Sequence, residues 1–147
     1  MILTDIEQLR TPCTDVESIE EADAIIAQLE KELAESSTKG VGLAAPQIGI
    51  WKKVAIIRIP GAEGNKGFSI DLVNASITKK FNQRIKNGEG CLSFPGTYIK
   101  TLRYDEIVVE GNLKEPRQFV ATDVEAWVIQ HEIGHYLGEL LIDFEVR

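Results

Sequence analysis

The two histidines of this 147-residue chain, His131 and His135, stand four residues apart in the segment HEIGH. On an α-helix, this spacing places both imidazoles on one face, one turn apart, where both can bind one cation. Glu132 is then displaced by about 100° around the helix axis, so its carboxylate can reach a water on the metal without being a ligand. The alternative is a pair of core histidines whose ring nitrogens bond to backbone carbonyls.

The residues around this pair predict a buried helix. Thr122 and Glu125 have the spacing of a capping box, and Gly138 is a suitable stop. Apolar residues between these points lie on more than one face of the helix, which favours burial on all sides.

The rest of the chain predicts an α+β fold in one domain, residues 1–147. Ser18 and Glu21 form a further capping box before apolar residues at helical spacing, which predicts a surface helix over 17–35. Apolar and β-branched runs predict strands over 54–57, 68–77, 107–109 and 118–121. We expect mixed or antiparallel sheets packed around the central metal-binding helix, with the N-terminal helix outside.

Charge and composition exclude several classes of protein. Hydrophobic residues make up 44% and charged residues 27%, which is typical of a globular chain, and the net charge of −7 argues against a DNA-coating protein. We find no signal peptide and no membrane-spanning run, and two cysteines indicate a reducing, cytoplasmic compartment. Lys79, Lys80, Arg84 and Lys86 form a basic cluster, interpreted as the solvated side of a hairpin, with RNA contact as the alternative.

A hydrolytic metal site usually has three protein ligands. Cys91 lies between glycines that let the backbone approach a ligand closely, and its thiolate would complete a Cys-His-His set. Taken alone, Cys91 is better explained as a buried structural cysteine, but beside an incomplete histidine pair the role of a ligand is favoured. Glu139 and Glu145 could be ligands only if the chain folded straight back after the helix.

A glycine-rich segment, GVGLAAPQ at 40–47, could be mistaken for a dinucleotide-binding loop. That motif needs a strand before it and a helix after it, whereas here a helix precedes and Pro46 follows. We therefore expect a loop that brings backbone N–H groups and the Gln47 amide to a site. The alternative is a tight connection with Gln47 in solvent.

Three ordered motifs together resemble the signatures of the peptide deformylase family: GVGLAAPQ at 40–47, EGCLS at 89–93 and QHEIGH at 130–135. Leu9, Arg10, Arg103, Gly138 and Asp143 also fall where the family pattern expects them, so the resemblance covers nearly the whole chain.

This resemblance implies a metal-dependent hydrolase that removes the N-formyl group from N-formylmethionyl nascent peptides and releases formate. It implies that Cys91, His131 and His135 hold one divalent ion, Fe²⁺ by preference, with Zn²⁺ or Ni²⁺ able to replace it. Glu132 would be the general base and acid. The Gln47 amide and the Leu92 backbone N–H would form an oxyanion hole.

The resemblance also implies how a peptide binds. An extended peptide would add to an exposed strand edge near Gly42 and near Gly96 to Tyr98. Val41 and Trp127 would be walls of the methionine pocket, although a plain core role for Trp127 is equally consistent with its sequence position.

The chain departs from the family pattern at three places. Gly134 replaces the usual Asp, and a helical glycine at this point suggests a close neighbour. The N-terminal segment Asp5-Ile6-Glu7 lacks the usual proline. Arg147 ends the sequence without the long tail that many bacterial members use to dock on the ribosome, so we expect no ribosome association. We also expect a monomer, in the cytosol of a bacterium or of a phage-infected host.

Three other functions compete with this one. A metallopeptidase would share the helix motif but needs a third ligand downstream. A deformylase-like domain without activity could hold metal or bind peptide ends, yet such a domain usually lacks the base. A thiol hydrolase built on Cys91 leaves His135 without a role.

Overall fold

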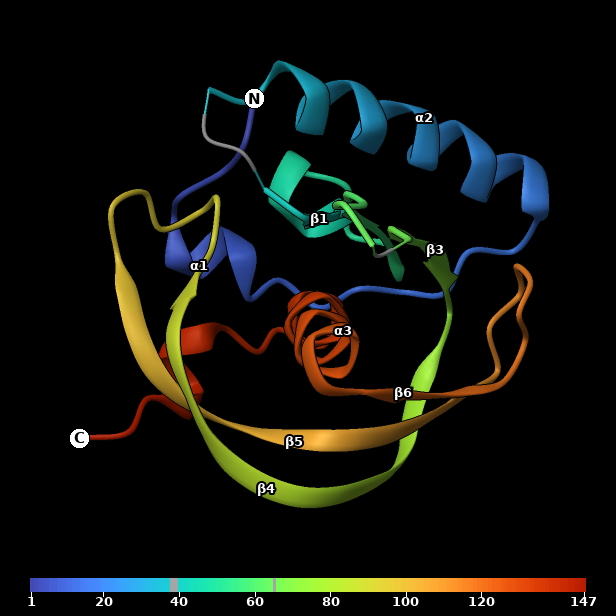
Figure 1. Cartoon of the computed structure of the whole chain (residues 1–147). Helices are drawn as coiled ribbons and strands as arrows, with labels where there is room; N and C mark the ends of the chain where they lie inside the picture. The colour runs from blue at the N-terminus through green and yellow to red at the C-terminus, as the bar shows by residue number, and fades with distance from the viewer. Residues whose placement is uncertain (38–39, 65) are drawn as a thin grey trace.

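Helix α3 (Asp123–Tyr136) lies at the centre of the molecule, between two three-stranded antiparallel sheets (Figure 1). This computed structural model describes residues 1–37, 40–64 and 66–147. One sheet contains β1 (Gly42–Ala44), β2 (Val54–Ile59) and β3 (Phe68–Val73). The other contains β4 (Ser76–Gly90), β5 (Tyr98–Glu110) and β6 (Phe119–Thr122) and curves under α3. The predicted α+β class is confirmed.

Helix α3 is buried along both of its sheet-facing sides, as its apolar pattern predicts. Ile129, Ile133 and Tyr136 are fully buried in the core between the sheets. The helix ends where predicted, because Gly138 has a φ of +78° and its N–H bonds to the carbonyl of His135. The Glu139 N–H bonds to the Gly134 carbonyl at 2.8 Å, which completes a Schellman motif.

The predicted capping box at the start of α3 is wrong. Thr122 occupies the N-cap position, but its side chain accepts no capping hydrogen bond. Asp123 has a φ of +52°, so the chain enters the helix through the left-handed region. This entry differs from the extended-to-helical path that a capping box requires.

The single strand predicted over 68–77 is in fact two strands in different sheets. Asn74 lies between β3 and β4 with a φ of +57°, a conformation that asparagine tolerates better than most residues. Its side-chain amide exchanges two hydrogen bonds of 3.0 Å with the backbone of Val16. The chain therefore turns at this point and leaves the first sheet.

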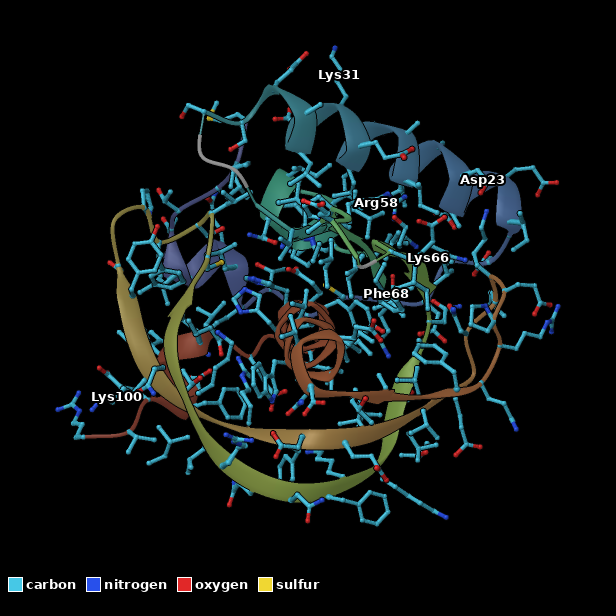
Figure 2. The ribbon with its side chains drawn as sticks, viewed as in Figure 1. Asp23, Lys31, Arg58, Lys66, Phe68 and Lys100 are labelled. Atoms are coloured by element: carbon cyan, nitrogen blue, oxygen red, sulfur yellow. The ribbon has the colours of Figure 1, made fainter. Side chains whose placement is uncertain are left out.

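Helix α2 (Ile19–Glu35) covers the outer face of the β1–β3 sheet and confirms the predicted N-terminal helix. Ser18 accepts a hydrogen bond from the Glu21 N–H, and the Glu21 carboxylate reaches back to the Glu17 N–H. Figure 2 shows Lys31 on the outer side of α2, whereas Arg58 lies beneath the helix. Arg58 pairs there with Asp71 at 2.7 Å and Glu30 at 3.3 Å, linking strands to helix.

The described residues also form three short helices: α1 (Ile6–Leu9), η1 (Ala45–Ile48) and η2 (Leu141–Phe144). Arg10, directly after α1, donates to the Gly138 carbonyl at 3.0 Å and forms two 2.8 Å bonds to Asp143. The N-terminal segment is thus fastened to the turn that follows α3.

The predicted basic cluster lies on β4, where Lys79, Lys80 and Arg84 are exposed. This agrees with a solvated strand face, and RNA contact stays an untested prediction. Among the described residues, no helix is both long and apolar enough to cross a membrane.

Replacing Leu29 by alanine tests the seam between α2 and the first sheet. Leu29 is 0% exposed, and alanine preserves the helix, so Leu29→Ala should lower the free energy of unfolding by about 2–5 kcal/mol. Ile19, on the same helix but 41% exposed, provides the control, and Ile19→Ala should cost about 0.5 kcal/mol. Urea unfolding of the metal-loaded proteins measures both. Equal losses would show that α2 is not anchored through Leu29.

Candidate active site

Three potential metal ligands converge beside α3. The Sγ atom of Cys91 lies 3.3 Å from Nε2 of His135, and this Nε2 lies 3.2 Å from Nε2 of His131. One ligand atom from each of the three residues lies within 4.8 Å of the others. Helix α3 supplies both histidines, and the connection between β4 and β5 supplies Cys91. Sequence reasoning left Cys91 open as a structural cysteine, whereas the fold brings it to the histidine pair.

The chemistry of this set suits a divalent transition metal. A thiolate and two imidazoles bind zinc or iron well and bind magnesium or calcium poorly. Glu132 Oε1 is buried and has no hydrogen-bond partner within the described part of the chain, so its lone pairs are available beside the three ligands. Glu139 and Glu145 do not belong to the group. The residues therefore fit a metal ion, and Cys91, His131 and His135 form a metal site.

A buried ion-pair network holds His131 in place. The Glu89 carboxylate is 2.6 Å from Nδ1 of His131 and accepts two hydrogen bonds from Arg103, at 2.9 and 2.6 Å. Thr101 adds a bond of 2.7 Å to the same carboxylate. Burial would raise the pKa of Glu89, but the bonds from Arg103 and His131 outweigh it and hold that pKa far below its usual range. Glu89 thus stays ionised and fixes the ring orientation of His131.

Sequence reasoning missed the role of Glu89. The available signal was the position of Glu89, an acidic residue in a glycine-rich segment, two positions before the candidate ligand Cys91. Arg103 entered only as a position that matches the family pattern. Pairing the two required knowledge of the strand register, which the sequence does not reveal.

The two histidines differ in protonation. Burial and the neighbouring charge of His131 hold the pKa of His135 well below its usual 6.5, so its imidazole is neutral and ready to bind a cation. Burial also lowers the pKa of His131, but hydrogen bonds to Cys91 and Glu89 outweigh burial and raise that pKa to about 10. At neutral pH His131 therefore carries a proton on each ring nitrogen. A metal that binds to Nε2 of His131 must displace the proton there, so metal binding releases a proton into solution.

Glu132 lies against the backbone of β1. A Cβ atom at position 42 would be 2.7 Å from Glu132 Oε2, so only glycine lets the strand approach this carboxylate. Burial raises the pKa of Glu132 to about 7, while the positive charge of His131 opposes the rise. A carboxyl group with such a pKa can take up and release a proton near neutral pH.

The close neighbour suggested for Gly134 is not present. A Cβ at this position would meet the nearest atoms, in Glu139, at 3.5 and 3.7 Å, which is ordinary van der Waals contact. Gly134 is therefore not required by packing, and the structure gives no reason for glycine here.

The Gln47 side chain points into the site, so its solvent-exposed alternative is wrong. The residue is 1% exposed, and its Oε1 accepts a 3.0 Å hydrogen bond from the Ala44 N–H. Its amide NH₂ is thereby directed to Ser93 Oγ at 3.0 Å and Cys91 Sγ at 3.5 Å. The Leu92 N–H, next to Cys91, has no hydrogen-bond partner among the residues described.

A pocket of about 260 Å³ opens beside the ligands. Its walls contain Glu132 with Cys91 and His131, and also every residue that the sequence suggests for peptide binding: Val41, Gly42, Gly96, Tyr98 and Trp127. The Trp127 side chain is half-buried with its ring on the pocket wall, so it is not a plain core residue. Among the described residues, strand β1 pairs only with β2 and is therefore an edge strand of its sheet.

The family model for polypeptide deformylase matches residues 2–145. The chain is 38% identical over 138 residues to peptide deformylase 1 of Bacillus anthracis, covering 91% of this chain and 83% of that protein. The chain belongs to the peptide deformylase family. The reaction of this family, hydrolysis of the formyl group of N-formylmethionyl peptides, is therefore the reaction of this chain.

Solved structures of peptide deformylases share this fold. A probable peptide deformylase from Synechococcus phage S-SSM7 superimposes with a TM-score of 0.83 at 31% identity and covers 98% of both chains. The peptide deformylase of Synechococcus elongatus in complex with actinonin gives a TM-score of 0.84 at 29% identity, over 100% of this chain and 78% of that one.

Changing Glu89 should weaken metal binding. Glu89→Gln keeps the shape of the side chain but removes the charge that orients His131, so affinity for Zn²⁺ should fall about 10–100-fold. Competition with a chelating dye measures this affinity. Glu63→Gln, in the exposed connection between β2 and β3, makes the same charge change and should leave affinity unchanged. Wild-type affinity in Glu89→Gln would contradict the orienting role.

Proposed function

We propose that residues 1–147 form one catalytic unit in which Cys91, His131 and His135 hold the metal and Glu132 moves the proton. The observation that carries this assignment is the convergence of the three ligand atoms beside a buried carboxylate without a partner among the described residues. A divalent cation at this set, when bound, would polarise water and the formyl carbonyl.

The residues of the chain divide the remaining work. Glu132 accepts a proton from the attacking water and passes a proton to the leaving amine. The Gln47 NH₂ and the Leu92 N–H donate to the formyl oxygen as negative charge develops on it, and removing one such donor typically lowers turnover by about 10²–10³-fold. Oε1 of Gln47, held by Ala44, keeps the amide turned to the site.

The peptide would lie along the open edge of β1. Gly42 and the segment from Gly96 to Tyr98 both line the pocket and could offer backbone groups to the peptide, and Val41 and Trp127 would enclose the methionine side chain. Substrates of this kind are nascent chains, which points to the cytoplasm as the site of action. We further propose that the chain acts as a monomer without stable ribosome association.

Formate release from a formyl-Met-Ala-Ala peptide tests the function. The metal-loaded protein should release formate and leave unformylated Met-Ala-Ala intact. Glu132→Gln should retain metal while its kcat falls by about 10²–10⁴-fold, because the base is lost. Glu139→Gln, directly after α3 and exposed, is the matched control and should behave as wild type. Cleavage of the unformylated peptide would instead indicate a metallopeptidase.

We propose Fe²⁺ as the bound ion, with Zn²⁺ and Ni²⁺ as possible substitutes, on the resemblance to the family and on the mixed thiolate and imidazole ligands. Protein purified without oxygen should contain iron in a one-to-one ratio by elemental analysis, and Cys91→Ala should lose it. A preparation that holds zinc alone under these conditions would overturn the iron assignment, and metal retention by Cys91→Ala would overturn the ligand assignment.

A further inference from the structure

A lysine contributes to the wall of the catalytic pocket. Lys86, near the end of β4, is half-buried and lines the pocket together with Trp127 and Glu132. Its Nζ lies 5.9 Å from the centre of the Trp127 ring, and the Arg84 guanidinium lies at the same distance from that ring. Two cations therefore lie close to one indole ring, and one of them, Lys86, lines the pocket.

The tryptophan is fixed by a carboxylate that also neutralises one of these cations. Trp127 Nε1 donates to Asp105 Oδ1 at 3.2 Å, and Asp105 Oδ2 accepts from Arg84 at 3.3 Å. The Arg84 charge is thus paired within the protein. Among the residues described, no salt bridge involves Lys86.

The other charges in the pocket wall do not compensate for Lys86. Glu89 is buried and paired with Arg103, and Glu132 lies buried against β1. Within the described residues, Lys86 is the only lysine or arginine that lines this pocket. Among the described residues, the wall therefore presents one ammonium group without a salt-bridge partner, on a chain whose net charge is −7.

This charge acts at short range. At physiological salt the screening length is about 8 Å, so the ammonium group influences only groups of the substrate that lie near the pocket. Lys86 pairs in register with Thr101 on β5. Thr101 is three positions along that strand from Tyr98, and Tyr98 belongs to the segment beside which the peptide is proposed to bind. Lys86 lies over the Trp127 ring, which is placed beside the methionine side chain, so the residues directly after the methionine are the nearest that could carry a carboxylate.

We propose that Lys86 is a specificity-determining residue, which favours N-formylmethionyl peptides with Asp or Glu at one of the two positions after methionine. The inference rests on the proposed function. A carboxylate on the peptide would form the ion pair that Lys86 lacks in the protein. The negatively charged remainder of the protein would repel the same carboxylate, so Lys86 would be the group that attracts it. The competing role is a purely structural one, in which Lys86 only covers the Trp127 ring.

The test compares amidated peptides that differ in one side chain: formyl-Met-Asp-Ala, formyl-Met-Ala-Asp, formyl-Met-Asn-Ala, formyl-Met-Lys-Ala and formyl-Met-Ala-Ala. For the wild-type enzyme, kcat/KM should be about two- to fivefold higher for at least one of the Asp peptides than for the Asn peptide. The difference should lie in KM and shrink as salt increases.

Variants separate the charge from the packing. Lys86→Met keeps an unbranched side chain over Trp127 and should abolish the preference, Lys86→Arg should retain it, and Lys86→Glu should reverse it toward the Lys peptide. Lys79 is on the same strand but is exposed and lies outside the pocket. Lys79→Glu changes the net charge of the protein as much as Lys86→Glu does, and it should keep the wild-type preference.

The outcomes are distinct. Formate release from formyl-Met-Ala-Ala without any preference for Asp over Asn, or a preference that persists in Lys86→Met, would overturn the role of Lys86 alone. A metal-loaded wild-type protein that releases formate from none of the five peptides would overturn the proposed function, and this inference with it.

Discussion

The buried ion pair between Glu89 and Arg103 is the interaction on which the site depends. Its atoms lie 2.6 Å apart, and both side chains are almost inaccessible to solvent. Replacing such a pair by apolar residues can be neutral for stability, so its value here is better sought in geometry. Glu89 joins β4 to β5 through Arg103 and Thr101, and joins both strands to α3 through His131. One carboxylate thereby fixes the position of a metal ligand relative to the sheet that carries the third ligand.

A β-bulge makes this contact possible. Lys86 pairs with Thr101 and Glu89 pairs with Ile99, so three steps on β4 correspond to two steps on β5. Without the extra residue, position 88 would face Ile99 and Glu89 would point to the opposite side of the sheet. Gly88 has a φ of +69° at this irregularity, which glycine adopts without strain. The bulge turns the Glu89 side chain inward, toward Thr101 and His131. Strand β4 then ends at Gly90, directly before the ligand Cys91.

The sequence predicted the parts of this protein that depend on local spacing. The histidine pair, both main helices and the end of α3 follow from intervals of three or four residues. The turn at Asn74 escaped prediction because it depends on a contact with Val16, far away in the sequence. The missing cap at Thr122 escaped because Asp123 has a left-handed conformation, which its residue type does not indicate. Glu89 was overlooked because strand register decides whether a residue faces the core, and a single bulge reverses the answer.

Burial and charge act in opposite directions on Glu132, and their balance suits proton transfer. Desolvation raises its pKa to about 7, whereas a cation bound at the neighbouring ligands would favour the ionised form and lower it. The close approach of Gly42 keeps water from one side of the carboxylate without adding any charge. A peptide added along β1 would remove further water, which strengthens every electrostatic interaction inside the site. Substrate binding and activation of Glu132 are therefore coupled through the edge of β1. A larger residue at position 42 would push the strand away from the Glu132 carboxylate and weaken this coupling.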